Sequence, residues 1–163
     1  MATGDSLVIF TPLCNEPPSS NYATLDTRNG HPVLDFDDTT AEGALFTSVL
    51  PRNYGGSGIT VYVHWMATSA TSGTGGWTVE FETCADGGTD LDSDSFASAQ
   101  TVTAATVPGT SGVVKVTNVA VSNGANIDSL AVGNAFRIRI KRDVANDTAT
   151  GDLELLAVEL KET

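Results

Sequence analysis

Two segments decide the fold, and they read Ile59-Thr-Val-Tyr-Val-His-Trp-Met66 and Trp77-Thr-Val-Glu-Phe-Glu82. Side chains two positions apart in a β-strand point to the same face of a sheet. In both segments one alternate set is apolar, and the same alternation recurs over Phe136–Ile140. We therefore predict three strands whose inward residues are Ile59, Val61, Val63, Trp65, Trp77, Val79, Phe81, Phe136, Ile138 and Ile140.

The rest of the chain continues this pattern. Short segments rich in Val, Ile, Thr and aromatic residues alternate with clusters of Gly, Ser, Asn and Asp, and no stretch shows the apolar stripe of an amphipathic helix. The sequence thus predicts an all-β sandwich or barrel with little or no helix. Besides the central strands at Gly58–Ala67 and Trp77–Cys84, we expect strands at Leu7–Leu13, Ala23–Asp26, Pro32–Phe36, Ala44–Leu50, Gln100–Ala104, Val113–Val121, Ala135–Asp143 and Asp152–Lys161.

Several local signals refine this arrangement. The Asn29-Gly30 pair favours a type I′ turn and predicts a hairpin. The last predicted strand is apolar on both faces, which indicates a central or covered position. The small residues of 68–76 predict a flexible connection. No change of composition marks a second domain, so we expect one domain over residues 7–163, preceded by a loose arm over residues 1–6.

Charge and hydropathy exclude several classes of function. The 163 residues carry a formal charge of −12, from 20 acidic and 8 basic side chains, and such a surface repels nucleic acid and anionic lipid. No apolar stretch is long enough to span a membrane, and the first residues lack the pattern of a secretory signal. We expect a protein without nucleic-acid or membrane partners that is made in the cytoplasm and leaves the cell, if at all, by another route such as lysis.

The basic residues cluster in one predicted strand. Arg137, Arg139 and Lys141 share a face there because they are two positions apart. One interpretation is a solvated face that counters nearby acids. The other is a contact with an acidic surface on a neighbouring subunit.

The sequence contains no recognisable catalytic apparatus. Neither His31 nor His64 lies in a nucleophile motif, and no phosphate loop or zinc motif is present. We therefore expect no enzyme activity and no cofactor, although two carboxylates facing each other across a glycosidase cleft would leave no signature in the sequence. For Cys14 and Cys84 we expect reduced, buried thiols, with a single disulfide as the alternative.

Two acidic clusters offer oxygen atoms to a cation. Asp90, Asp92 and Asp94 alternate like the first ligands of a calcium loop, but the glycine and glutamate that complete such a loop are missing. A solvated turn is the main interpretation for this loop and for the cluster over Asp35–Asp38, and we expect no bound metal.

Over most of its length the chain resembles a group of small tailed-phage virion proteins. The resemblance rests on Asn21–Asp38, Ala44–Tyr54, Gly58–Trp65 and Gly151–Leu160. It implies a jelly-roll-like antiparallel sandwich that decorates or cements a capsid as a homotrimer bound to the major capsid protein. The implied location is the virion surface, after assembly in the host cytoplasm.

Two alternative functions stay open beside the capsid hypothesis. One is a tail or baseplate adhesion module. The other is a carbohydrate-binding module, for which Tyr22, Tyr54 and Tyr62 are the available stacking groups, because we expect Trp65 and Trp77 to be in the core.

Overall fold

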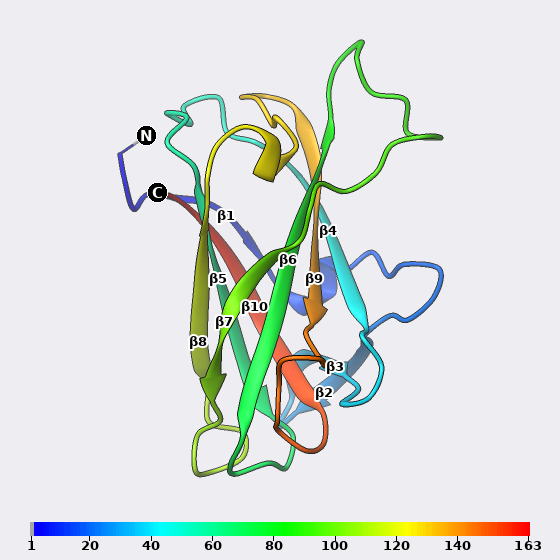
Figure 1. Cartoon of the computed structure of the whole chain (residues 1–163), viewed down its shortest axis with the longest axis vertical. Coiled ribbons are helices and arrows are strands. Elements are labelled where there is room, and N and C mark those ends of the chain that lie inside the picture. Colours follow the sequence, from blue (N-terminus) through cyan, green and yellow to red (C-terminus); the bar gives the residue numbers. More distant parts are fainter. Residues whose placement is uncertain (1) are drawn as a thin grey trace.

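Ten strands form two antiparallel sheets that pack face to face in the computed structural model, which describes residues 2–163 (Figure 1). The strands are β1 (Ser6–Phe10), β2 (Thr24–Arg28), β3 (His31–Phe36), β4 (Gly43–Val49), β5 (Ile59–Ala67), β6 (Thr74–Cys84), β7 (Gln100–Thr106), β8 (Lys115–Val121), β9 (Ala135–Arg142) and β10 (Leu153–Glu162). The helices among these residues are two 3-10 turns, η1 (Pro12–Cys14) and η2 (Ala125–Ile127), and neither could cross a membrane. The predicted all-β, jelly-roll-like sandwich is confirmed.

The two sheets differ in size and in their use of the chain ends. Sheet A has the order β2-β3-β10-β5-β8, with β1 also paired to β10, and sheet B has the order β4-β9-β6-β7. Strand β10 pairs with β3 through its first residues and with β1 through its last, on one side, and with β5 on the other. The C-terminal strand is thus central, as its apolar character predicts.

The core lies between the sheets, where every predicted inward residue is fully buried. Trp65 of sheet A and Trp77 of sheet B meet across the interface with ring centroids 6.2 Å apart. Strand β6 begins at Thr74, inside the segment predicted as a flexible connection. Glycine is needed at position 75 of this strand for a steric reason. A Cβ there would lie 2.5 Å from the ring of Trp65, so a residue with a side chain would clash with the core.

Local backbone conformation and hydrogen bonds define the hairpin turn and the N-terminal segment. Asn29 and Gly30 both have positive φ, 48° and 80°, which gives the predicted type I′ hairpin between β2 and β3. The amide of Gly4 donates to the carbonyl of Glu162 at 2.7 Å, so the described part of the predicted arm is attached to β10. Met1 lies outside the described residues. Both cysteines are free, but the expectation that both are buried is wrong, because η1 places Cys14 at the surface.

Arg142 is a charged residue in the interior of the protein. Its side chain is fully buried at the end of β9, and Asp147 accepts hydrogen bonds from its Nε at 2.6 Å and its Nη2 at 3.3 Å. The remaining donors reach three backbone carbonyls, those of Phe36, Ala149 and Gly151. All five N–H groups of the guanidinium are therefore satisfied, which fixes the loop from 143 to 152 against β3.

Candidate functional site

The outer face of sheet B carries an ordered set of charges. Strand β6 places Glu82 opposite Arg137 and Glu80 opposite Arg139, and each arginine forms an ion pair with its glutamate. Hydrogen bonding to Glu82 raises the pKa of Arg137. We call these four residues the arginine–glutamate ladder. The basic strand thus counters acids of its own chain, as one of the two sequence interpretations holds, and its role in a subunit contact stays a prediction.

An aromatic ring lies on the same face. Phe96 belongs to the loop between β6 and β7, and its ring centroid is 4.3 Å from the guanidinium carbon of Arg139 and 5.3 Å from that of Arg137. The amide of Ala97 donates to the carbonyl of Phe81 at 2.8 Å, which fixes this end of the loop to the sheet. The cation–π contacts hold the ring beside the ladder. No sequence pattern pointed to Phe96, because its position depends on how the loop folds back onto the sheet.

A polar groove adjoins the ladder at the edge of sheet B. The segment from Pro18 to Asn21 forms one wall, Ala41 and Gly43 form the other end, and Arg139 and Lys141 complete the lining of a groove of about 290 Å³. Backbone hydrogen bonds hold the wall in place, since the amide of Gly43 donates to the carbonyl of Asn21 at 2.8 Å. We call this space the Lys141 groove.

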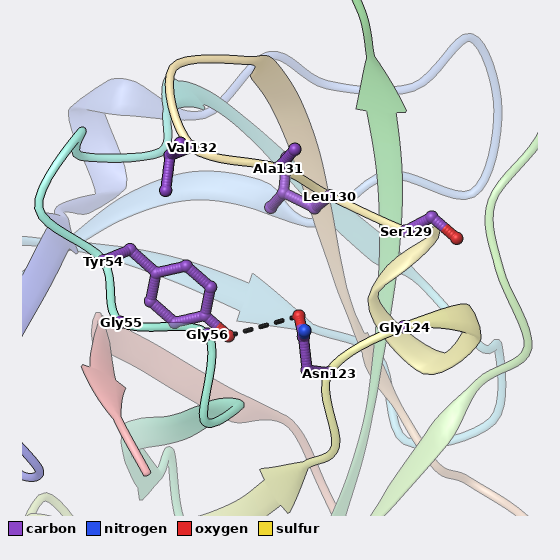
Figure 2. Close-up of a pocket in the computed structure, with 9 residues that line it drawn as sticks. All are labelled: Tyr54, Gly55, Gly56, Asn123, Gly124, Ser129, Leu130, Ala131 and Val132. Carbon is purple, nitrogen blue, oxygen red and sulfur yellow. Dashed lines mark hydrogen bonds between the residues drawn. The ribbon is translucent and has the colours of Figure 1, made fainter.

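A larger cavity lies at one end of the sandwich. It measures about 440 Å³ and is lined by loop residues around Tyr54, Asn123 and Leu130 (Figure 2). The hydroxyl of Tyr54 accepts from the amide of Gly58 at 2.9 Å and lies 3.4 Å from Asn123 Oδ1. Burial raises the pKa of Tyr54. The lining contains no charged side chain, and its polar side chains are those of Tyr54, Asn123 and Ser129.

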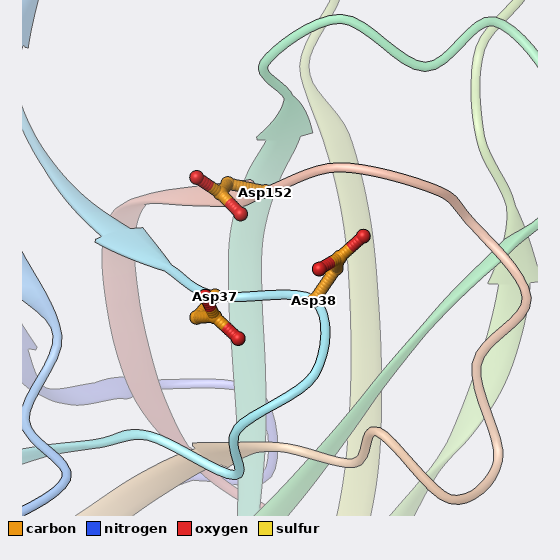
Figure 3. A group of neighbouring side chains, drawn as sticks. All are labelled: Asp37, Asp38 and Asp152. Atoms are coloured by element: carbon orange, nitrogen blue, oxygen red, sulfur yellow. The ribbon is translucent and has the colours of Figure 1, made fainter.

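Three carboxylates meet at the chain segments that follow β3 and precede β10 (Figure 3). Ligand oxygens of Asp37, Asp38 and Asp152 lie within 4.8 Å of one another, a separation that a calcium ion can bridge. Hydrogen bonds from Thr39 and Thr40 lower the pKa of Asp37 to about 2, and Asp38 accepts from an amide at 2.7 Å. The sequence did not predict that Asp152 joins this cluster, because Asp152 comes close to Asp37 and Asp38 only through the pairing of β3 with β10.

The other acidic side chains behave differently. In residues 2–163 the group just described is where three acidic ligands converge, and Asp90, Asp92 and Asp94 do not form such a group. Asp90 instead accepts from the amide of Asp92 at 3.1 Å, as in an exposed turn. Burial, together with Asp152 and Glu154, raises the pKa of Asp35 to about 6.

The tyrosines considered for sugar stacking are scattered. Tyr22 is exposed, Tyr54 is buried, and Tyr62 lies on sheet A below Lys161, whose Nζ is 5.8 Å from the ring centroid. The two tryptophans lie in the core, as predicted. The aromatic ring that lies with fixed polar groups is therefore Phe96, which the sequence analysis did not select.

Comparisons with protein-family models and with curated proteins find no match. Solved structures do share the fold. The family 11 carbohydrate-binding module from Clostridium thermocellum, in complex with a β-1,3-1,4-mixed-linked tetrasaccharide, superposes with a TM-score of 0.50 at 8% identity, over 100% of this chain and 98% of that chain. The resemblance is thus to a non-catalytic module, and it extends over both whole chains.

Two larger proteins contain a similar region. The CBM22-1–GH10 modules of endo-1,4-β-D-xylanase 10B from Clostridium thermocellum, complexed with xylohexaose, give a TM-score of 0.54 at 14% identity over 98% of this chain and 29% of that chain. An arabinose-bound GH51 α-L-arabinofuranosidase gives 0.50 at 14% identity over 91% of this chain and 23% of that chain. The chain therefore spans less than a third of these two proteins.

These findings overturn the prediction of a phage capsid decoration protein. The solved structures that share the fold are carbohydrate-binding modules and glycoside hydrolases, and none of the three is a virion protein. The prediction failed because its motifs encode strands and turns, and jelly rolls serve both viral capsids and lectins. The predicted virion location and capsid partner rested on the same resemblance and are no longer supported. The trimer stays a prediction.

Proposed function

We propose that this domain is a non-catalytic carbohydrate-binding module that binds a polysaccharide on the outer face of sheet B. The observation that carries the proposal is the arginine–glutamate ladder beside the ring of Phe96. Sugar rings present hydroxyl groups around their edge and C–H groups on their faces. Guanidinium donors held in place by buried glutamates, next to an aromatic ring, match both features.

The ladder holds its polar groups in advance of binding. Arg139 uses Nε to bind Glu80, so within residues 2–163 its two terminal nitrogens are left to donate to sugar hydroxyls. The glutamates restrict the rotamers of the arginines, and Phe96 limits them further. Binding then orders few side chains, which favours affinity.

The same pairing argues against hydrolysis. Glu80 and Glu82 are the acidic pair on this face, and both accept hydrogen bonds from guanidinium groups. A glycosidase needs one carboxyl group that carries a proton for the leaving oxygen. Neither glutamate is placed to supply it, so we propose binding without bond cleavage.

Affinity electrophoresis against xylan, mixed-linkage β-glucan, arabinan, polygalacturonate and dextran sulfate tests the proposal. We expect the protein to be retarded by at least one polymer, and Phe96→Ala and Arg139→Met to weaken that binding about tenfold or more. Arg52→Met is the matched control, because Arg52 is an exposed arginine in the loop between β4 and β5. Equal binding by all four proteins, or binding to no polymer, would contradict the proposal.

A further inference from the structure

The Lys141 groove breaks the pattern of the ladder beside it. Along β6 the residues opposite the three outward-facing basic side chains of β9, Arg137, Arg139 and Lys141, are Glu82, Glu80 and Thr78. The two arginines therefore have acidic partners, and Lys141 faces a neutral residue. The cation at the groove is the one position in this series without a matching carboxylate.

Other acids do not compensate this charge. In residues 2–163 no carboxylate oxygen lies within 4.0 Å of the Lys141 ammonium. Two acids that lie close to this position in the chain have other partners. Glu42, which precedes Gly43, accepts from the amide of Asp37 at 2.9 Å, and Asp143, two residues after Lys141, accepts from Asn146 at 2.8 Å. Among the described residues Arg52, Lys115 and Lys161 also have no carboxylate within 4.0 Å, but Lys141 lines a groove. The formal charge of −12 opposes the binding of anions over most of the surface, so an anion bound here depends on local contacts with this lysine.

Three of the other lining residues have neutral hydrogen-bonding side chains. Ser19, Ser20 and Asn21 are exposed and bring two hydroxyls and one amide to the groove. These groups can donate to an anionic oxygen without adding negative charge. The groove therefore combines the unpaired Lys141 and the ion-paired Arg139 with neutral donors, a combination that suits an anion attached to a polar ligand.

Gly43 keeps the groove open. A Cβ at this position would lie 3.4 Å from Cγ of Lys141 and 3.8 Å from the side chain of Arg139. Any larger side chain would occupy the space between the lysine and the wall. The backbone of Gly43 is fixed, since its amide and its carbonyl bind Asn21 and Ala23.

We propose that the Lys141 groove binds the anionic group of an acidic sugar residue, so that the polysaccharide ligand of this domain carries carboxylate or sulfate groups. This inference rests on the proposed function and specifies its substrate class. The sugar residue bearing the anion lies in the groove, and its neighbours in the polymer extend along the ladder toward Phe96.

Isothermal titration with polygalacturonate and with the same polymer after carboxyl reduction tests the inference, and dextran sulfate beside dextran forms the sulfate arm. We expect an acidic polymer to bind about tenfold more tightly than its neutral counterpart. Lys141→Met should remove that preference, and Lys141→Arg should retain it. Lys161→Met is the control, because it removes the same charge from sheet A. The arm that shows the preference identifies carboxylate or sulfate.

The outcomes separate this inference from the proposed function. Equal binding of acidic and neutral polymers, or an unchanged preference in Lys141→Met, would overturn the anion subsite and leave the ladder as a neutral sugar site. Failure of every polymer to bind would overturn both. Circular dichroism of each variant distinguishes a lost subsite from a lost fold.

Discussion

Strand β9 ends with an arginine inside the protein and carries two others on its surface, and the two environments give the same side chain opposite roles. Arg142 is fully buried and makes five hydrogen bonds, three of them to backbone carbonyls of other segments. Arg137 and Arg139 are about one-third exposed, and their ion pairs lie within one sheet. The buried arginine therefore connects separate segments of the fold, whereas the surface arginines pair with acids of their own sheet and stay partly exposed to solvent.

The largest effect should follow from removing the buried arginine. Arg142→Met leaves the carboxylate of Asp147 without a counterion in a position that is 4% exposed. Breaking such a pair destabilises a protein by about 3–5 kcal/mol. We expect calorimetry to show a Tm lower by roughly 10 °C or more, given the size of the domain.

Arg52→Met, at the surface, should leave the Tm almost unchanged and serves as the control. A loss of less than about 1 kcal/mol in Arg142→Met would show that the interior of the domain tolerates the unpaired acid, and the comparison would fail.

The surface pairs should rank by the burial of their glutamates. Glu82 is 3% exposed and Glu80 is 12% exposed, so loss of the arginine leaves the less hydrated acid at Glu82. We expect urea unfolding to give a loss of about 2 kcal/mol for Arg137→Met and about 1 kcal/mol for Arg139→Met. The reverse order would mean that the contact with Phe96, which is shorter for Arg139, outweighs burial.

Asp35, an acid that has no arginine partner, should lower the stability of the folded protein at neutral pH. The folded-state pKa of Asp35 is about 6, above its unfolded value, so the folded protein binds a proton more tightly than the unfolded chain does. The unfavourable contribution of Asp35 is therefore present above pH 6 and is relieved as the pH falls from about 6 toward 4.

Asp35→Asn tests this sign. We expect the variant to be more stable than the natural chain at pH 7.5, by at most about 1 kcal/mol because the side chain keeps some contact with water. The two proteins should converge in unfolding experiments at pH 4. A destabilised variant at pH 7.5 would instead show that a favourable contact of the carboxylate dominates.

How far the sequence predicted this molecule depends on how local each feature is. The strand alternation around Trp65 and Trp77 is local, and it predicted the core correctly. Gly75 was assigned to a loop, because its need to pass Trp65 appears only when the sheets are packed. The basic strand and its outward glutamates were visible as separate patterns, but their pairing required the register of β6 against β9. The position of Phe96 and the shape of the Lys141 groove depend on loop conformations, which no periodic pattern in the sequence predicts.

The smallest effect concerns the exposed acids of the loop that carries Phe96. Asp90, Asp92 and Asp94 are exposed, and their side chains have no cationic partner within residues 2–163. We expect the triple change to Asn to alter the unfolding free energy by less than about 0.5 kcal/mol, with or without added calcium. A Tm that rises with calcium in the natural chain and not in the triple variant would show that this loop binds the ion after all.

The central place of β10 has a consequence for how the chain is made. Residues 153–162 are synthesised after the other nine strands of this domain, yet β1, β3 and β5 all pair with them. Until they emerge, sheet A consists of three separate parts, β2 with β3, β5 with β8, and β1 alone, whose edges carry unpaired backbone groups, which are sites of aggregation. Synthesis that stops before β10 should therefore yield insoluble protein, even though most of the buried side chains have already been made.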